Sequence, residues 1–353
     1  MAYLPSKALH PGLMLQKVLN NSDMTQRNLS ARTGLTEKHI SQIINGEANL
    51  TVDTALLLEN VLGGTASFWI NLDKNYQETQ ARLEREQQLE KEIILLKNFP
   101  YGDLVNCKYV EQTRKPKERV RNLWKFFGVN SLDFVSNIEA VAYRRKDGAG
   151  VKSEALATWL RCGEIEAAKL DLVAYNRQAL KSLLSDVRKL TRRVDSKVFA
   201  DLTAMLAEVG VGLVCVPHFA HTQVNGATRW MRQNPVIQLS IRGRDADKFW
   251  FTLFHELGHI INHGRKEEFI EFINDEKNQK EIDADAFAQK TLIPSAPYGV
   301  FVRRQDYSAA AIEVFAETIQ VDPGIVLGRL KHDGYVEFAQ LSYMHSKLMW
   351  MPD

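Results

Sequence analysis

A run of apolar residues between positions 249 and 261 has the composition of a single buried helix. Phenylalanine, tryptophan and leucine occupy five of the six positions from 249 to 254, and two isoleucines stand at 260 and 261. A helix with apolar residues on nearly all sides is normally buried inside a protein. The polar residues in the middle of this run, between His255 and His259, are therefore predicted to lie on a buried helix.

Strand patterns precede this helix, and helical patterns follow it. Short apolar stretches rich in β-branched residues predict three strands, at Val211–Pro217, Gly226–Met231 and Val236–Ile241. Most of residues 115–208 has a helical pattern, as do residues 308–319 and 322–332. We therefore expect a mainly α chain in which a small antiparallel sheet packs against the 249–261 helix, an α+β arrangement.

Two short helical patterns near the N-terminus flank a turn at Gly34. Thr36 is placed to cap the second of these helices. The small core that would hold the helices together consists of Ala31, Leu35, Ile40 and either Ile43 or Ile44. The pattern predicts a helix-turn-helix, whose second helix enters the major groove of DNA.

The length of 353 residues indicates two or three domains. Residues 73–97 are rich in glutamine, glutamate, arginine and leucine and predict a connector helix, which the segment 98–102 breaks. We expect an all-α helix-turn-helix domain over residues 1–78, a helical connector over 79–149 and an α+β domain with C-terminal helices over 150–353.

The composition excludes several classes of protein. The net charge of +2 implies no general attraction to polyanions, and three scattered cysteines without C-x-x-C spacing indicate a reducing compartment. No signal-peptide core and no apolar run long enough to cross a bilayer is present. We therefore expect a cytoplasmic protein that makes no use of a membrane.

The buried helix contains an H-E-x-x-H motif, His255-Glu256-Leu257-Gly258-His259. Residues four apart project from the same face of a helix, so His255 and His259 can bind one Zn²⁺ through neutral imidazoles. Glu256, beside the metal, can take a proton from water. The motif predicts a zinc site with Glu256 as the catalytic base of a hydrolase.

A third ligand must come from elsewhere in the chain. The metzincin pattern would need a histidine at position 265, which is arginine, and His263 lies about 12 Å along the helix from His255. The acidic segment 281–288 offers Glu281 and Asp283, which point in nearly opposite directions on a helix. Asp283 shares a side with Phe287, which favours it as the buried one, and Glu281 stays open as the alternative.

These motifs give residues 150–332 a resemblance to the ImmA/IrrE metallopeptidases, which have an H-E-L-G-H helix followed by a helix of the form E-A-[ND]-x-F-A. Here the second helix begins Asp283-Ala284-Asp285-Ala286-Phe287-Ala288 and ends at Leu292-Ile293-Pro294. The resemblance implies a zincin-like metallopeptidase with His255, His259 and Asp283 as zinc ligands. Asp283 stands where the family usually has glutamate. Candidates for stabilising the oxyanion are His218, His221, Arg329, His332 and Tyr335.

Residues from about 8 to 78 resemble the HigA-type antitoxins of the XRE helix-turn-helix family. The resemblance rests on His10-Pro11-Gly12, on the hairpin ending at Asn45-Gly46, and on Ser67-Phe68-Trp69 with Tyr76. The side chains expected to meet DNA are Gln26, Thr36, Lys38, His39, Gln42 and Asn45. Six basic and seven acidic residues among the first 80 predict weak nonspecific DNA binding by one copy. Two copies in a homodimer, which we expect, or the basic clusters within residues 108–125 and 188–197 would have to strengthen it.

Two classes of function fit these features. The first is a DNA-binding regulator or antitoxin whose zinc endopeptidase cleaves a regulatory protein. The second is a DNA-binding repressor or antitoxin in which the metallopeptidase fold is a non-catalytic sensor or scaffold. Both predict double-stranded operator DNA, here the chain's own promoter, as a partner, together with a protein substrate or a cognate toxin.

Overall fold

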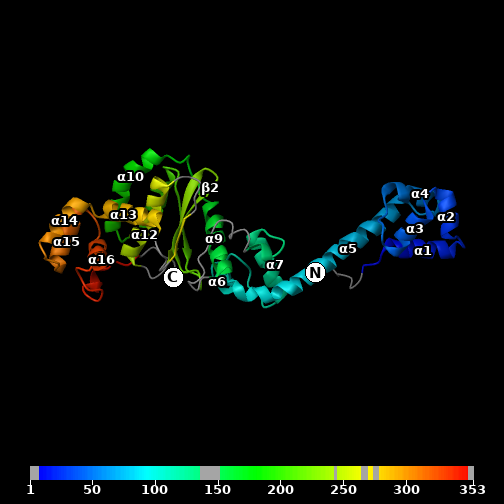
Figure 1. Cartoon of the computed structure of the whole chain (residues 1–353), viewed down its shortest axis with the longest axis horizontal. Helices are drawn as coiled ribbons and strands as arrows, with labels where there is room; N and C mark the ends of the chain where they lie inside the picture. Colours follow the sequence, from blue (N-terminus) through cyan, green and yellow to red (C-terminus); the bar gives the residue numbers. More distant parts are fainter. Residues whose placement is uncertain (1–7, 136–151, 242–244, 264–268, 273–277, 349–353) are drawn as a thin grey trace. The chain divides into compact units, whose positions relative to one another are not determined.

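The structure is a computed structural model that describes residues 8–135, 152–241, 245–263, 269–272 and 278–348 (Figure 1). The chain forms two compact units. The N-terminal unit comprises Met1–Ile94 and Lys115–Arg121, and the C-terminal unit comprises Leu95–Arg114 and Asn122–Asp353. The predicted boundary between residues 149 and 150 lies outside the described residues.

The N-terminal unit consists of helices. They are α1 (Pro11–Asn21), α2 (Gln26–Thr33), α3 (Glu37–Asn45), α4 (Val52–Leu62) and α5 (Ala66–Glu92). A threonine stands immediately before each of the last four, and its side-chain oxygen accepts a backbone N–H of the first turn, at Thr25, Thr36, Thr51 and Thr65. These caps satisfy amide groups that a helix start leaves without partners, so the local sequence determines where each helix begins. The predicted cap at Thr36 is among them.

The core of this unit differs from the predicted one at Ala31. Ile40 and Ile43 are buried, and Leu35 and Ile44 pack against the core, as expected. Ala31 is exposed, because the buried position of α2 is Leu29 and a residue two further along a helix points to the other side.

Helices α1 and α3 approach each other closely at Gly12. A Cβ at that position would lie 2.2 Å from the carbonyl oxygen of Ile43, so only glycine fits. The preceding His10 caps α1 by accepting the Gly12 N–H at 2.9 Å, and its ring packs edge-on against Tyr76 on α5. The His10-Pro11-Gly12 motif thus holds three helices of the unit together.

The C-terminal unit contains a four-stranded sheet surrounded by helices. Its strands are β1 (Gly212–Pro217), β2 (Val224–Met231), β3 (Asn234–Ile241) and β4 (Phe269–Phe272). Its helices include α6 (Tyr101–Asn106), α9 (Ser153–Ala167), α10 (Arg177–Lys189), η2 (Leu190–Arg192), α11 (Val198–Ala207), α12 (Ala246–Asn262), α13 (Gln279–Leu292), α14 (Ser295–Arg303), α15 (Ala309–Ile319), α16 (Pro323–His332) and η3 (Ser342–Met344). The segments η1 (Ile93–Asn98) and α7 (Pro116–Phe127) include residues of both units. None of the described helices is long and apolar enough to span a bilayer.

The sheet has the strand order β1-β3-β2-β4. Strand β2 runs antiparallel to both β3 and β4, whereas β1 runs parallel to β3. The prediction of a purely antiparallel sheet is therefore wrong, because β1 pairs with β3 and not with the strand that follows it in the sequence. Strand β4 was not predicted.

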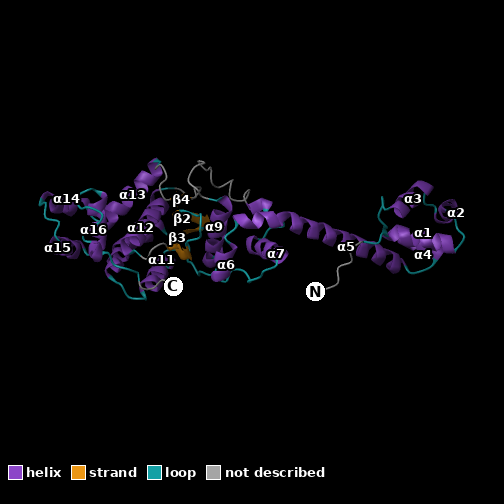
Figure 2. Ribbon diagram, turned by 90° about the horizontal axis from the view of Figure 1, so that it is seen from below, coloured by secondary structure: helices purple, strands orange, loops and turns teal. Residues whose placement is uncertain are grey.

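Helices α9 and α12 cover opposite faces of this sheet, as Figure 2 shows with the strands between them. Alternate residues of a strand point to opposite faces. On β3, Ile237 and Leu239 belong to the core that includes α12, whereas Gln238 donates to the Trp159 carbonyl of α9. The helix that carries the H-E-x-x-H motif thus packs on β2 and β3, on the face of the sheet opposite to α9.

Candidate metal centre and nucleic-acid interface

Helix α12 carries the three motif residues into the interior of the C-terminal unit. His255, Glu256 and His259 are each at most 1% exposed. The helix packs on β2 and β3 on one side and on α13 on another. Burial of two imidazoles and a carboxylate costs free energy unless each has partners, so their surroundings indicate what they do.

Three donor atoms converge between α12 and α13. His255 Nε2 lies 3.0 Å from His259 Nε2 and 3.0 Å from Glu281 Oε2, and His259 Nε2 lies 3.5 Å from the same oxygen. Zinc bonds of about 2.1 Å at tetrahedral angles place ligand atoms about 3.4 Å apart. Two imidazoles and one carboxylate at these separations fit a zinc ion and leave a fourth position for water or a substrate.

The carboxylate of this cluster belongs to Glu281. The prediction that Asp283 is the buried carboxylate facing the histidines is wrong. Asp283 is exposed, and its Oδ1 accepts from Gln279 at 2.9 Å. Helix α13 packs on α12 at Gly258, where a Cβ would lie 3.0 Å from Phe287 Cδ1 and 3.3 Å from the Cα of Ala284. The buried positions of α13 are Ala284, Ala288 and Leu292, and the half-buried Phe287 lies at the edge of that stripe, so sharing a side with Phe287 does not bury Asp283.

Each of the two histidines also contacts a second polar group. Asp285, one turn after Glu281, accepts from His255 Nδ1 at 2.9 Å, and His263 Nδ1 lies 3.1 Å from His259 Nδ1. A proton held on Nδ1 leaves Nε2 as the free electron pair for a metal. His259 also stacks on Phe269 of β4, with ring centroids 4.1 Å apart, which fixes the plane of its ring.

Burial and hydrogen bonding shift the ionisation of this cluster. Burial lowers the pKa of His259, and the Glu281 carboxylate offsets this only in part. Burial raises the pKa of Glu281, but hydrogen bonds and charge interactions with His255 and His259 outweigh it and bring the pKa to about 2. The neutral imidazole and ionised carboxylate that a metal requires are thus favoured at neutral pH.

Glu256 points from α12 toward strand β2. The hydroxyl of Thr228 donates to Glu256 Oε2 at 2.6 Å. Next to it, a Cβ on Gly226 would lie 2.5 Å from Glu256 Oε1, so the strand leaves room for the carboxylate only because this residue is glycine. The strand therefore orients the predicted base, and the motif alone gave no sign of Thr228.

The residues considered for the oxyanion lie in different places. Arg329 and His332 line a pocket next to α12, whereas Tyr335 is exposed and packs on the ring of Tyr307. His218 Nδ1 and the hydroxyl of Thr222 form a hydrogen bond at 3.2 Å, and His221 is exposed with a left-handed backbone. Arg329 and His332 are thus the two of the five candidates that line the pocket beside α12, and both side chains contact Asp333.

The N-terminal unit places the predicted DNA-contacting residues on its outer helices. Thr36, Lys38 and Asn45 are exposed, and Gln26, His39 and Gln42 are half-buried. Lys38, Gln42 and Asn45 follow one another at helical spacing along α3. Gly34, with a φ of 77°, makes the sharp turn between α2 and α3. The arrangement is that of a helix-turn-helix with a polar outer face.

Two segments of the chain match known families. Residues 214–331 match the IrrE N-terminal-like domain of the M78 peptidases, and residues 15–69 match the helix-turn-helix family. The chain joins a helix-turn-helix domain to an M78 peptidase-type domain. The first match covers β1 to α16 and so includes both histidines, Glu256 and Glu281. The second match covers α2 and α3 with their caps.

Similar proteins exist for the helix-turn-helix domain. The virulence-associated protein I of Dichelobacter nodosus is 28% identical over 80 residues, which is 22% of this chain and 74% of that protein. Two solved structures each cover 24% of this chain. One, from Nostoc punctiforme, is described as an antidote protein of a plasmid maintenance system, with 27% identity, 93% of its length covered and a TM-score of 0.24. The other is an addiction module antidote of a HigA family from Coxiella burnetii, with 30% identity, 95% covered and a TM-score of 0.23.

Proposed function

We propose that this chain is a cytoplasmic DNA-binding regulator whose M78-type domain is a zinc-dependent endopeptidase that cleaves a regulatory protein. The observation that supports the peptidase most directly is the convergence of His255, His259 and Glu281 beside a buried glutamate. Glu256 also favours catalysis over a non-catalytic scaffold. A buried carboxylate costs stability, and a fold that served only as a scaffold would gain nothing from keeping it.

The residues of the site would have three roles, which are metal binding, proton transfer and orientation of the histidines. His255, His259 and Glu281 would hold Zn²⁺, which when bound supplies Lewis acidity toward water and a peptide carbonyl. Glu256, oriented by Thr228, would accept the proton of the attacking water and return it to the leaving amine. Asp285 and His263 would keep the Nδ1 atoms of the two histidines engaged, so that each Nε2 faces the metal position.

Measurement of zinc content and of peptide cleavage tests this half of the proposal. The full chain, loaded with zinc, and its Glu256→Gln variant are each incubated with a peptide library and with a co-produced repressor or toxin. We expect equal zinc in both proteins and a rate at least about 100-fold lower in the variant. A zinc-loaded wild type that cleaves nothing in either assay would refute the peptidase and favour the non-catalytic alternative.

The helix-turn-helix domain supports the regulatory half of the proposal. The polar outer face of α3 carries lysine, glutamine and asparagine, which can pair with base edges or phosphates. We propose that a homodimer reads a palindromic operator in the chain's own promoter, and that a cognate toxin is a further protein partner, as the resemblance of residues 8–78 to HigA-type antitoxins implies. A footprint on the upstream DNA at stated salt, with and without zinc, is the test. No protected site at low salt would refute DNA regulation.

A further inference from the structure

The face of the sheet opposite to α12 carries a buried arginine, Arg229 of β2, whose side chain is 9% exposed. Its guanidinium makes two hydrogen bonds to α9. Nη1 donates to Glu164 Oε1 at 3.1 Å, and Nη2 donates to the backbone carbonyl of Leu160 at 2.8 Å. Because the donors of a guanidinium lie in one rigid plane, two bonds to the same helix fix both the position and the direction of the side chain. Strand β2 is thus anchored to α9 at Arg229.

Glu164 is itself held by a second arginine. Its other oxygen, Oε2, accepts from Arg161 Nη1 at 2.6 Å, and Arg161 Nε donates to the Phe126 carbonyl of α7 at 3.0 Å. Each oxygen of the carboxylate therefore accepts from a different arginine. Hydrogen bonds between ionised groups are stronger than neutral ones and have more defined geometry. Glu164 is thus a fixed acceptor against which Arg229 of β2 is placed.

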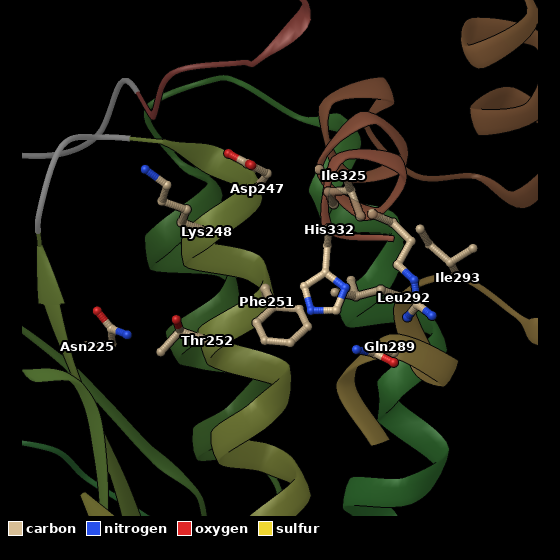
Figure 3. Close-up of a pocket in the computed structure, with 12 residues that line it drawn as sticks. Asn225, Asp247, Lys248, Phe251, Thr252, Gln289, Leu292, Ile293, Ile325 and His332 are labelled. Carbon is tan, nitrogen blue, oxygen red and sulfur yellow. The ribbon is translucent and has the colours of Figure 1, made fainter. Parts of the chain in front are cut away.

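The pairing of β2 within the sheet is irregular next to the proposed base. The register between β2 and β4 shifts between Val224 and Gly226, so that Asn225 is an extra residue on β2. An extra residue of this kind bends a strand and interrupts its hydrogen-bond ladder. Asn225 and Thr252 of α12 line the same pocket, so this irregular part of β2 lies beside α12 (Figure 3). The ladder with β4 alone therefore does not determine where this part of β2 lies.

The anchor at Arg229 acts on the other face of the sheet through the neighbouring residue. Consecutive residues of a strand point to opposite faces, so a fixed Arg229 also fixes Thr228. The hydroxyl of Thr228 is the group that donates to Glu256 Oε2 at 2.6 Å. Because a hydrogen bond weakens steeply with distance and angle, a small movement of β2 would remove this one.

We propose that Glu164 and Arg229 are positioning residues for the general base, because they anchor β2 to α9 and so hold Thr228 where it orients Glu256. The catalytic part of this statement rests on the proposed function. The coupling across the sheet, from α9 through β2 to Glu256, does not rest on it, and two experiments test the two parts separately.

The first experiment measures steady-state cleavage, by the zinc-loaded full chain, of a library peptide that the wild type cuts. Glu164→Ala removes the carboxylate that holds Arg229. We expect kcat to fall about 10- to 100-fold with KM unchanged, because a displacement of about 1 Å in a catalytic group can cost that much. Glu164→Gln keeps an acceptor oxygen for Arg229 and should restore most of kcat.

Glu166→Ala is the matched control for this experiment. Glu166 lies on the same helix, its side chain is 30% exposed against 34% for Glu164, and it bonds to Tyr109 and Lys169 and not to the sheet. We expect a wild-type kcat in this variant. Equal kcat values in Glu164→Ala and Glu166→Ala, or a rise in KM with kcat unchanged in Glu164→Ala, would overturn the proposal.

The second experiment needs no catalysis. Thr228→Val removes the hydroxyl that donates to Glu256 but keeps the shape of the side chain, so it should lower the urea midpoint of unfolding. The shift is measured in the wild type, in Glu164→Ala and in Glu166→Ala. We expect a smaller shift in Glu164→Ala alone, because the hydrogen bond is already weakened there and coupled sites are not additive. Equal shifts in all three chains would mean that Glu164 only stabilises the fold, and would overturn the proposal.

Arg229→Lys replaces Glu164→Ala in both experiments if the latter does not fold, since lysine keeps the charge but lacks the planar pair of donors. The same loss of kcat and the same smaller shift are expected. A smaller shift in a chain that cleaves no peptide would support the positioning of Glu256 and refute the peptidase. Cleavage of peptides together with equal shifts would refute the positioning and leave the peptidase intact.

Discussion

On α3 of the N-terminal unit, Lys38 and Asn45 are exposed and Gln42 is half-buried, whereas on α12 the residues His255 and Glu256 are at most 1% exposed. Side chains of the first kind are positioned by their own helix, and their proposed partner is DNA. Side chains of the second kind are positioned by other elements of the same unit. The two helices therefore depend on the rest of the fold to very different degrees.

This difference has an energetic consequence. Replacing an exposed residue of α3 is expected to remove a proposed contact to DNA and to leave the folded chain almost unchanged. Replacing a residue of the α12 cluster removes a partner from another buried polar group, so we expect it to change the proposed metal binding, the orientation of the neighbouring side chains and the stability together. We therefore expect substitutions on α3 to change DNA binding alone, and substitutions in the α12 cluster to change stability as well.

The largest effect is expected for the carboxylate of the metal cluster. Glu281→Ala removes a donor that lies 3.0 Å from His255 Nε2, and we expect zinc affinity to fall by more than about 100-fold. Asp283→Ala, two residues away on the exposed side of α13, should bind zinc as the wild type does. Competition with a chelator measures both. The opposite ranking would restore Asp283 as the ligand.

A smaller effect is expected for Asp285, which contacts a proposed ligand and not the metal. Asp285→Ala removes the acceptor for His255 Nδ1, and loss of such a partner lowers zinc affinity by about 10- to 100-fold. Asp285→Asn keeps an acceptor oxygen and should recover part of that loss. Chelator competition again gives the affinities, and an Asp285→Ala variant with wild-type affinity would show that Asp285 does not orient the histidine.

Close packing around Glu256 predicts a stability effect at Gly226. Gly226→Ala would place a Cβ 2.5 Å from Glu256 Oε1 and 3.0 Å from Thr252 Cγ2, and we expect it to cost about 1–3 kcal/mol. Gly102→Ala in α6 is the control, because nothing lies within 4 Å of its Cβ. Urea unfolding compares the two, and an equal stability for both variants would mean that β2 can move away from Glu256.

The smallest effect on the protein itself is expected on α3. Gln42→Ala should leave unfolding unchanged but cost about 1–3 kcal/mol of operator binding and relax preference at one base pair. Lys38→Ala should weaken binding to all sequences alike and reduce the salt slope by about one, if Lys38 meets phosphate. Shift assays over a salt series separate the two patterns, and identical behaviour of both variants would mean that Gln42 does not read bases.

The sequence by itself determined the features that arise within one helix or strand. The cap at Thr36, the turn at Gly34 and the one-face alignment of His255 with His259 depend only on residues a few positions apart, and the structure shows them as predicted. The three strands before α12 were also predicted, to within two residues at each end, because they are short apolar runs between turns.

Only the tertiary structure decided which residues of other helices and strands contact the H-E-x-x-H motif. Helical spacing allowed either Glu281 or Asp283 to face α12, and the choice depended on how α13 packs on α12 at Gly258, where both Ala284 and Phe287 lie close. The parallel pairing of β1 with β3 and the placement of Thr228 against Glu256 likewise depend on which strands become neighbours. Contacts between residues far apart in the chain follow from packing, and the pattern along one segment does not contain that information.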